Sequence, residues 1–489
     1  MSLSKSRYTL AYRCPKLLWL SLYKKEEEED LGNAKVFENG TMVGDLARSL
    51  FGKYTLIDYN KGIEQMIEDT KKAINNKDKI ICEASFNYQN NFCSVDILRR
   101  EKNGFSLYEV KSSTHINDVY LADVSYQTWI LKKLGYNIID SYIIIVNNEY
   151  VFKDKLDIKK FFKIIKLTDE IDLSNISENV QNYMNIINMK EEPSIDLSLG
   201  CHSPYDCPFF KYCTRNLGEP NVFSISGLSF AKKLKLYKEG FVLFKDLINK
   251  DELNDKIKEQ ILFELNDLDD KIDKEYIKNE IDSYTYPLYF LDFESYEEAV
   301  PKFNGTRPYQ QITFQYSLHY YLKNGGELYH KEYLSSDYND DPRIKLAEKL
   351  CQDIPKDVTV LAYNMSFEKT RIKEMALLCP GLKEHLMNIH DNIKDLLPIF
   401  NKRHYYSKNM QGKSTIKYVL PSLFPNDPQL NYHNLEQVHK GDEASNAYLS
   451  LSSLNPDEEA RLRNNMLKYC CLDTYAMVKI YNKLKEAVK

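Results

Sequence analysis

The sequence predicts an α/β (α+β) protein with two domains. The first observation is length, because 489 residues exceed what one hydrophobic core usually organises. The second is that strand patterns occur in two separate series, at residues 80–112 and 287–335, each followed by alternating helix and strand patterns. The third is composition, since 43% hydrophobic and 28% charged residues are typical of a globular chain. We therefore expect two sheet-containing domains.

The first domain is expected over residues 1–215. Helical patterns come first, then three strand patterns separated by turn residues, with Asn103 and Gly104 as a hairpin signal. A further helix, ended by Gly135, and a further strand follow. The predicted helices cover 1–30, 37–51, 63–75 and 119–134, and the predicted strands cover 80–88, 92–100, 105–112 and 137–146.

Residues 216–285 are polar and helical in pattern, and we expect a linker there. Residues 225–229 and 237–240 are also compatible with a helix-hairpin-helix-like module that grips a phosphate backbone. The sequence leaves both interpretations open.

The second domain is expected over residues 286–489. Three strand patterns are followed by a helix, a strand and a second helix, and a long helix begins near Pro456. The predicted strands cover 287–294, 311–321, 327–335 and 358–363, and the predicted helices cover 342–353, 366–378 and 456–489.

Charged residues interrupt two apolar strands of the first domain. Asp96, Glu109 and Lys111 form the pattern Asp-x₁₂-Glu-x-Lys across a predicted hairpin, and Glu109 and Lys111 share one face. Burying charges in such strands is unfavourable unless they bind something. Asp96 and Glu109 are therefore candidate ligands of a divalent metal, with Lys111 beside the attacking water or the phosphate. A cross-strand salt bridge is the alternative.

This segment resembles the PD-(D/E)XK superfamily and, more narrowly, the RecB-like nucleases, whose third motif often reads Glu-Val-Lys. The resemblance implies a restriction-endonuclease-like core and gives Gln127 the position of a glutamine that contacts metal-bound water or DNA. Leu131 stands where the family usually has tyrosine. Residues 40–47 lack the family's histidine ligand, which leaves Asp45 as its candidate replacement. Glu83 is a further candidate ligand or a solvent-facing strand residue.

Three cysteines, Cys201, Cys207 and Cys213, follow this core as Cys-x₅-Cys-x₅-Cys, and Cys14 precedes it. Four thiolates suit an iron–sulfur cluster or a structural zinc, but the gaps do not match zinc knuckles. The arrangement resembles that of the iron–sulfur RecB-like nucleases of the CRISPR-associated and AddB types, which implies a [4Fe–4S] cluster. The other cysteines are expected to be buried small hydrophobes: Cys82, Cys93, Cys351, Cys379, Cys470 and Cys471.

The second domain carries five candidate catalytic residues. Asp292 and Glu294 share one face of a strand, Glu368 opens a helix, and Tyr469 and Asp473 share one face of the last helix. Four carboxylates in this order can hold two divalent ions, as a two-metal phosphodiester hydrolase requires. Hard oxygen ligands favour Mg²⁺ or Mn²⁺.

These motifs resemble the DnaQ-like exonucleases of the RNase H-like fold, in the subgroup whose last motif is Tyr-x-x-x-Asp. The resemblance implies 3′–5′ exonuclease activity in which Tyr469 orients the attacking water. Glu368 departs from the aspartate that is usual in the second motif. Asp395 and residues 412–417 match positions that border the substrate groove, or they are a helix-start aspartate and a basic loop. The whole chain resembles an uncharacterised bacterial family of predicted RecB-like nucleases fused to a DnaQ-like domain.

The net charge of −5 neither indicates nor excludes a nucleic-acid partner, because catalytic carboxylates depress it. No apolar stretch has the length of a membrane span, and the amino terminus lacks a signal-peptide core, so we expect a cytoplasmic protein with reduced cysteines. The function expected is a metal-dependent nuclease acting on DNA ends or single strands, in repair or in defence against foreign DNA. The alternatives are an RNA exonuclease and a nucleic-acid-binding scaffold with a decayed site.

Overall fold

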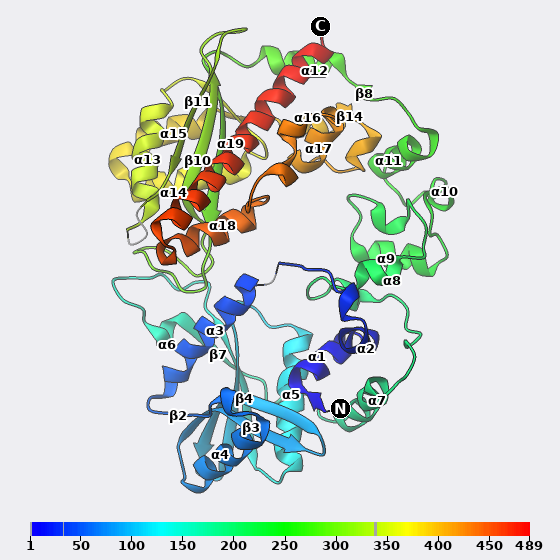
Figure 1. Ribbon diagram of the computed structural model, residues 1–489, viewed down its shortest axis with the longest axis vertical. Coiled ribbons are helices and arrows are strands. Elements are labelled where there is room, and N and C mark those ends of the chain that lie inside the picture. The colour runs from blue at the N-terminus through cyan, green and yellow to red at the C-terminus, as the bar shows by residue number, and fades with distance from the viewer. Residues whose placement is uncertain (1, 33, 337–339) are drawn as a thin grey trace. The chain divides into compact units, whose positions relative to one another are not determined.

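The computed structural model describes residues 2–32, 34–336 and 340–489 (Figure 1). The chain divides into two compact units. The first unit comprises Met1–Leu217 together with Glu298–Gln310, and the second comprises Gly218–Glu297 together with Gln311–Lys489. The residues expected as a linker thus lie almost wholly in the second unit. Both units combine helices with sheets, so the α/β class is confirmed.

The first unit is built on a seven-stranded mixed sheet of order β2-β3-β4-β5-β6-β7, with β1 beside β4. Strands β3, β4 and β5 are antiparallel, whereas β5 and β6 are parallel. All four predicted strands are present to within three residues. The bounds are β1 (Leu3–Ser4), β2 (Thr55–Leu56), β3 (Ile80–Tyr88), β4 (Asn91–Glu101), β5 (Gly104–Lys111), β6 (Ile138–Val146) and β7 (Phe162–Lys166).

The amino-terminal segment forms two helices, so the prediction of one helix over residues 1–30 is wrong. The helix breaks at Cys14, whose backbone is extended, and Pro15 begins the next helix. Proline disfavours helical backbone in the residue before it, which explains the break. The helices of this unit are α1 (Lys5–Arg13), α2 (Pro15–Tyr23), α3 (Ala34–Arg48), α4 (Ile63–Asn75), α5 (Asp118–Lys133), α6 (Ile158–Phe161), α7 (Ile176–Ile187) and α8 (Phe210–Thr214).

Helix α5 is buried over most of its length and packs against the sheet. Tyr126 of α5 stacks on Tyr8 of α1, with ring centroids 4.3 Å apart. The segment Glu298–Gln310 belongs to this unit as well, since Thr306 accepts a 2.9 Å backbone hydrogen bond from Phe152. Two helices and the sheet therefore enclose the face on which the candidate site lies.

The second unit contains a five-stranded sheet of order β11-β10-β9-β12-β13, with β9, β10 and β11 antiparallel and β9, β12 and β13 parallel. The four predicted strands are again present. A separate two-stranded sheet joins β8 and β14. The bounds are β8 (Lys271–Ile272), β9 (Leu288–Tyr296), β10 (Ile312–Tyr321), β11 (Leu328–Leu334), β12 (Thr359–Ala362), β13 (Ile393–Asp395) and β14 (Tyr405–Tyr406).

Helices cover both faces of this sheet. Leu291 of β9 packs in a core with α13 and α14, whereas Phe290 packs in the core that contains α19. The 32-residue α19 runs along β9 and β10 (Figure 1). The helices are α9 (Phe230–Lys238), α10 (Phe244–Leu247), α11 (Asp255–Asn266), α12 (Lys274–Asp282), α13 (Pro342–Asp353), α14 (Ser366–Leu378), α15 (Lys383–Asp391), α16 (Leu397–Asn401), α17 (Ile416–Leu423), α18 (Gly441–Ser450) and α19 (Pro456–Ala487).

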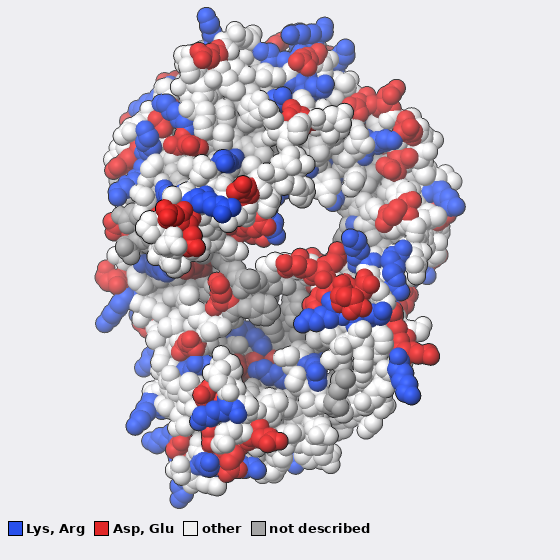
Figure 2. All heavy atoms as spheres, in the orientation of Figure 1, with Lys and Arg blue, Asp and Glu red and all other residues white. Residues whose placement is uncertain are grey.

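Helices α9, α10 and α11 share a small apolar core of their own, which includes Ile225 and Leu236. Gly227 and Gly240, one in each motif of the possible helix-hairpin-helix module, adopt φ of 75° and 87°, a region that favours glycine. Basic and acidic side chains are interspersed on the face drawn in Figure 2. Among the helices that the structure describes, none combines the length and apolar character needed to cross a membrane.

Candidate functional sites

Three carboxylates of the first unit lie at one level of adjacent strands. The Cys82↔Ile97 and Ala84↔Val95 pairs flank Glu83 of β3 and Asp96 of β4, and the Ile97↔Tyr108 pair adjoins Asp96 and Glu109 of β5. The Lys5 ammonium contacts both Asp96 and Glu109, so these two carboxylates lie close together. The backbone N–H of Val110 donates a 2.7 Å hydrogen bond to Asp96 Oδ2 and fixes that carboxylate.

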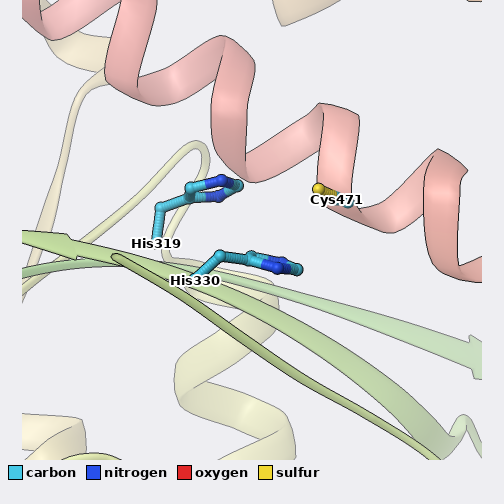
Figure 3. A group of neighbouring side chains, drawn as sticks. All are labelled: His319, His330 and Cys471. Carbon is cyan, nitrogen blue, oxygen red and sulfur yellow. The ribbon is translucent and has the colours of Figure 1, made fainter. Parts of the chain in front are cut away.

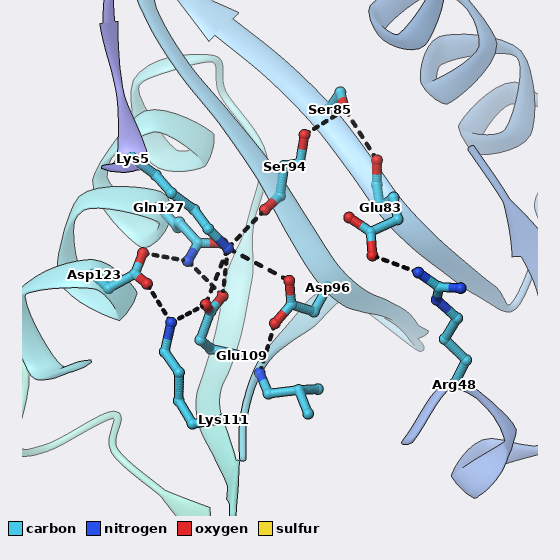
Figure 4. A network of polar contacts seen from close by, with 11 residues as sticks. Lys5, Arg48, Glu83, Ser85, Ser94, Asp96, Glu109, Lys111, Asp123 and Gln127 are labelled. Atoms are coloured by element: carbon cyan, nitrogen blue, oxygen red, sulfur yellow. Dashed lines mark hydrogen bonds and ion pairs between the residues drawn. The ribbon is translucent and has the colours of Figure 1, made fainter. Parts of the chain in front are cut away.

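Glu109 is the centre of a buried polar network (Figure 4). Lys111 Nζ lies 2.6 Å from Glu109 Oε1 and 2.7 Å from Asp123 Oδ2. Gln127 Nε2 donates to Glu109 Oε2 at 2.7 Å and to Asp123 Oδ1 at 2.8 Å. The structure thus brings together four predicted site residues, with Asp96 as the fourth, and adds Asp123, one helical turn before Gln127.

Lys5 of α1 reaches into the same network. Its ammonium lies 3.0 Å from both carboxylate oxygens of Glu109, 3.4 Å from Asp96 Oδ1 and 3.2 Å from the Ser94 carbonyl oxygen (Figure 4). These oxygens are hard donors of the kind that bind Mg²⁺ and Mn²⁺. The Lys5 ammonium is itself a cation bound by these oxygens, so the oxygen atoms are arranged to bind a positive charge.

Burial and mutual repulsion set the ionisation of this site. Burial, followed by the Glu109 charge, raises the pKa of Asp96 to about 7. Burial opposes ionisation of Glu109, but Lys111 and Lys5 hold the pKa of that carboxyl below its usual range. Burial and Glu109 raise the pKa of Asp123. Glu109 is therefore the ionised centre of the site, and Asp96 keeps a proton more readily than an exposed carboxyl does.

Asp45 does not join these carboxylates. Its side chain is 57% exposed and pairs with Arg48 at 2.6 Å. Arg48 also contacts Glu83, with Nη2 3.0 Å from Glu83 Oε1. Glu83 therefore borders the site as one partner of an ion pair. Asp45 is connected to it through the shared partner Arg48.

The four predicted cysteines line one small cavity. Cys14 lies at the break between α1 and α2, and Cys213 lies in α8. Cys207 donates its backbone N–H to the Cys201 carbonyl at 2.9 Å. Burial raises the pKa of all three downstream thiols, that of Cys213 to about 11. Residues from both ends of the unit thus converge on one soft, sulfur-rich pocket.

The second unit gathers four carboxylates, of which Glu294, Glu368 and Asp473 are buried and Asp292 is partly buried. Asp292 and Glu294 lie on β9, Glu368 lies in the first turn of α14, and Asp473 lies on α19. Burial is the largest cause of a raised pKa in each of them, and repulsion from Asp473 adds to it for Asp292 and Glu294. The pKa is about 6 for Asp473 and about 8 for Glu368.

This cluster fits divalent cations. Glu368 is 3% exposed, and its Oε2 atom has no hydrogen-bond partner in the part of the chain that the structure describes. Asp292 is partly buried, and the Cys470 Sγ atom lies 3.7 Å from its Oδ2 atom. Buried carboxylates without matching donors are unfavourable unless a cation neutralises them. The donors are oxygens, as Mg²⁺ and Mn²⁺ require.

Two tyrosines approach Asp473. Tyr469, one turn earlier on α19, is 4% exposed, and burial followed by the Asp473 charge raises the pKa of its hydroxyl. Tyr432 donates its hydroxyl to Asp473 Oδ1 at 2.6 Å. The sequence indicated Tyr469 but gave no signal for Tyr432, which begins a short 3₁₀ helix (Tyr432–Asn434) 41 residues before Asp473.

A cavity of about 880 Å³ is lined by residues between Lys417 and Glu443, among them Tyr432, which donates a hydrogen bond to Asp473. Lys417 and Tyr432 line the cavity, and both act electrostatically on Asp473. A Cβ atom on Gly441, at the start of α18, would lie 3.7 Å from Glu294 Oε2. The cavity is therefore linked to Asp473 through Tyr432, and Lys417 places a positive charge on its wall.

Asp395 and residues 412–417, which the sequence placed at the border of the substrate groove, have different roles in the structure. Lys417, at the end of the 412–417 stretch, reaches the cavity, whereas Gly412 packs tightly against the Gln260 side chain. Asp395 Oδ1 accepts backbone hydrogen bonds from Asn364 and Leu397, each 2.9 Å long. Asp395 therefore organises the backbone beside Glu368.

Comparisons with known proteins cover part of the chain. A family model described as a domain of unknown function (DUF2779) matches residues 289–415, a range that includes Asp292, Glu294 and Glu368. An uncharacterized protein of Mycoplasma genitalium, MG366, is 31% identical over 218 residues. The match covers 41% of this chain and 32% of the relative, so the chain spans about a third of that relative's length. Residues 289–415 thus match the DUF2779 family model, and part of the chain has a distant relative in Mycoplasma.

Proposed function

We propose that the protein is a metal-dependent nuclease with two catalytic centres, one in each unit, acting on DNA ends or single strands. The observation that carries the proposal is the convergence of Asp292, Glu294, Glu368 and Asp473 in a largely buried cluster with raised pKa values. Two divalent ions held by such carboxylates would supply an activated water and stabilise the leaving oxygen of a phosphodiester.

In the second unit, the chain's own residues position the substrate and the water. Tyr469 presents a hydroxyl kept protonated by burial, which orients the nucleophilic water. Tyr432 holds Asp473 through its 2.6 Å hydrogen bond. Lys417 offers a positive charge to the phosphate at the cavity mouth. The strand order β11-β10-β9-β12-β13, with two carboxylates on the central strand, supports the DnaQ-like, RNase H-like interpretation.

In the first unit, Asp96 and Glu109 would hold the metal, and Glu83 borders it. Lys111 lies on the same strand face as Glu109 and stabilises charge on the reacting phosphate once its ion pairs rearrange. Gln127 fixes the Glu109 carboxylate. Because the Lys5 ammonium occupies the space between the two carboxylates, metal entry requires Lys5 to withdraw.

The sulfur-rich pocket supports a [4Fe–4S] cluster held by Cys14, Cys201, Cys207 and Cys213. Such a cluster would join the break between α1 and α2, where Cys14 lies, to residues 201–213. Lys5 is carried by α1. Its proposed role is structural.

The test uses the full chain, purified anaerobically, with end-labelled single-stranded DNA, duplex DNA and RNA. We expect cleavage of DNA in Mg²⁺ or Mn²⁺ and none in EDTA. Cleavage of RNA alone would make the protein an RNA exonuclease, and binding without cleavage of any polymer in either metal would reduce it to a scaffold. DNA cleavage would be consistent with a role in repair or in defence against foreign DNA.

A further inference from the structure

A second group of ligand-type side chains lies between the sheet of the second unit and α19. His319 of β10 and His330 of β11 are direct cross-strand partners, so both imidazoles point to the face covered by α19. Cys471 projects from α19 toward them (Figure 3). One ligand atom from each of the three residues lies within 4.8 Å of the other two.

Hydroxyl groups orient both imidazoles. The Thr474 hydroxyl lies 2.8 Å from His319 Nδ1, and the Ser317 hydroxyl lies 3.0 Å from His330 Nε2. The Thr474 contact leaves His319 Nε2 for another partner, and His330 Nε2 is the nitrogen that lies 3.9 Å from Glu332 Oε2. Metal-binding histidines commonly have their second nitrogen fixed by a hydrogen bond in this way.

Burial keeps both imidazoles neutral, which is the form that binds metal, whereas it raises the pKa of the Cys471 thiol to about 11, so the thiol must lose its proton on binding. Burial, with a contribution from His330, lowers the pKa of His319 to about 3, and burial also lowers the pKa of His330. The Glu332 Oε2 atom lies 3.9 Å from His330 Nε2. Because a neutral imidazole does not form an ion pair, this carboxylate remains available as a metal ligand. Glu332 follows His330 by two residues on β11 and therefore shares its face.

We propose that His319, His330 and Cys471 bind a zinc ion, with Glu332 as the fourth ligand. Two imidazoles, a thiolate and a carboxylate form a tetrahedral Zn²⁺ donor set, with bonds of about 2.0–2.3 Å. Binding releases the Cys471 proton to solvent, since the thiolate is the ligand. The cluster around Asp292 offers mainly carboxylate oxygens, with the Cys470 sulfur beside Asp292, and suits Mg²⁺ or Mn²⁺ instead, so we expect the two sites to select different metals.

The site would join β10 and β11 to α19 by coordinate bonds. Asp473 lies two residues after Cys471 on α19. Cys470, the residue just before Cys471, contacts Asp292 of β9. A zinc ion here would therefore fix the part of α19 that carries Asp473. This consequence rests on the proposed function, whereas zinc binding itself does not.

The experiment measures zinc and iron per chain by mass spectrometry in the full-length protein. Cys471→Ser and His330→Ala should each lose one equivalent of zinc with iron unchanged. Cys379→Ser, a cysteine of similar intermediate exposure in the same unit, should keep both metals. Equal zinc in the parent and in both site variants would overturn the proposal, whatever the nuclease activity.

A second measurement needs no variant and so does not depend on how a variant folds. The parent is treated with a thiol-alkylating reagent, with and without a zinc chelator, and each cysteine peptide is quantified. We expect the chelator to increase alkylation of Cys471 at least several-fold and to leave Cys351, a reference thiol in the same unit, unchanged. An alkylation rate at Cys471 that does not respond to the chelator would overturn the proposal.

Discussion

Replacing Glu368 with glutamine should stabilise the metal-free second unit at high pH. The pKa of Glu368 is raised from 4.5 to about 8, first by burial and then by Asp395. The folded state therefore retains a proton that the unfolded state releases, so this group makes stability fall as pH rises between 4.5 and 8. At about 1.4 kcal/mol for each pKa unit, the loss is about 4 kcal/mol at pH 8 and under about 1 kcal/mol at pH 5.

Coupling to Asp292 and Glu294 spreads the protonation over the cluster, so we expect Glu368→Gln to stabilise by about 2–4 kcal/mol at pH 8 and little at pH 5. The assay is hydrogen exchange of α19 peptides in EDTA, since both tryptophans, Trp19 and Trp129, lie in the first unit. Glu384→Gln is the control, because Glu384 is an exposed partner of Lys356.

Metal should cancel most of this stabilisation. Ions that bind only the folded parent stabilise it by about 2.7 kcal/mol at one hundred times the dissociation constant, and Glu368→Gln removes one of their ligands. The reasoning would be refuted if Glu368→Gln destabilised α19 equally at pH 5 and pH 8 in EDTA, or if Mn²⁺ protected the variant as well as the parent.

Three further predictions concern single residues. In a Lys111→Ala background, Tyr469→Phe should slow single-turnover release of nucleotides from a 3′-labelled oligonucleotide by about one or two powers of ten. Asp473→Asn should slow this release more and change its metal dependence. Equal activity of Asp473→Asn and its parent would contradict this prediction. The parent should be brown when purified anaerobically, and Cys207→Ser should lose iron and lower the unfolding temperature read by tryptophan fluorescence; a parent without iron rules the cluster out. Lys5→Met should tighten Mn²⁺ binding at the first-unit site about tenfold, because it removes a competing ammonium, and an unchanged electron paramagnetic resonance titration would show that Lys5 does not compete.

Most secondary structure near the sites could be predicted, because periodicity and turn residues act locally. The helix break at Cys14 could not be read from an apolar pattern, although Pro15 was a signal for it. The association of Glu298–Gln310 with the first unit could not be predicted either, since it depends on contacts with residues such as Phe152 that are distant in the sequence.

In the candidate sites, too, residues indicated by local patterns could be predicted, whereas residues brought in by long-range contacts could not. Asp96, Glu109 and Lys111 were indicated because charges in apolar strands are unusual, and Asp123 had a weaker signal as a carboxylate one turn before Gln127. Lys5 carried no signal, because its partner Glu109 lies 104 residues away. The sequence placed His319 and His330 on the two strands of a predicted hairpin, but their exact pairing needed the register of β10 and β11, and the approach of Cys471 depends on how α19 packs.

The central claim is that two metal-dependent centres in one chain hydrolyse nucleic acid. The most direct measurement compares cleavage of labelled DNA by the parent, Lys111→Ala, Asp292→Asn and the double variant in Mg²⁺, Mn²⁺ and EDTA. The account predicts that each single variant loses one pattern of products and retains the other, that the double variant is inactive, and that EDTA silences the parent. Undiminished cleavage by the double variant, or full activity of the parent in EDTA, would contradict it.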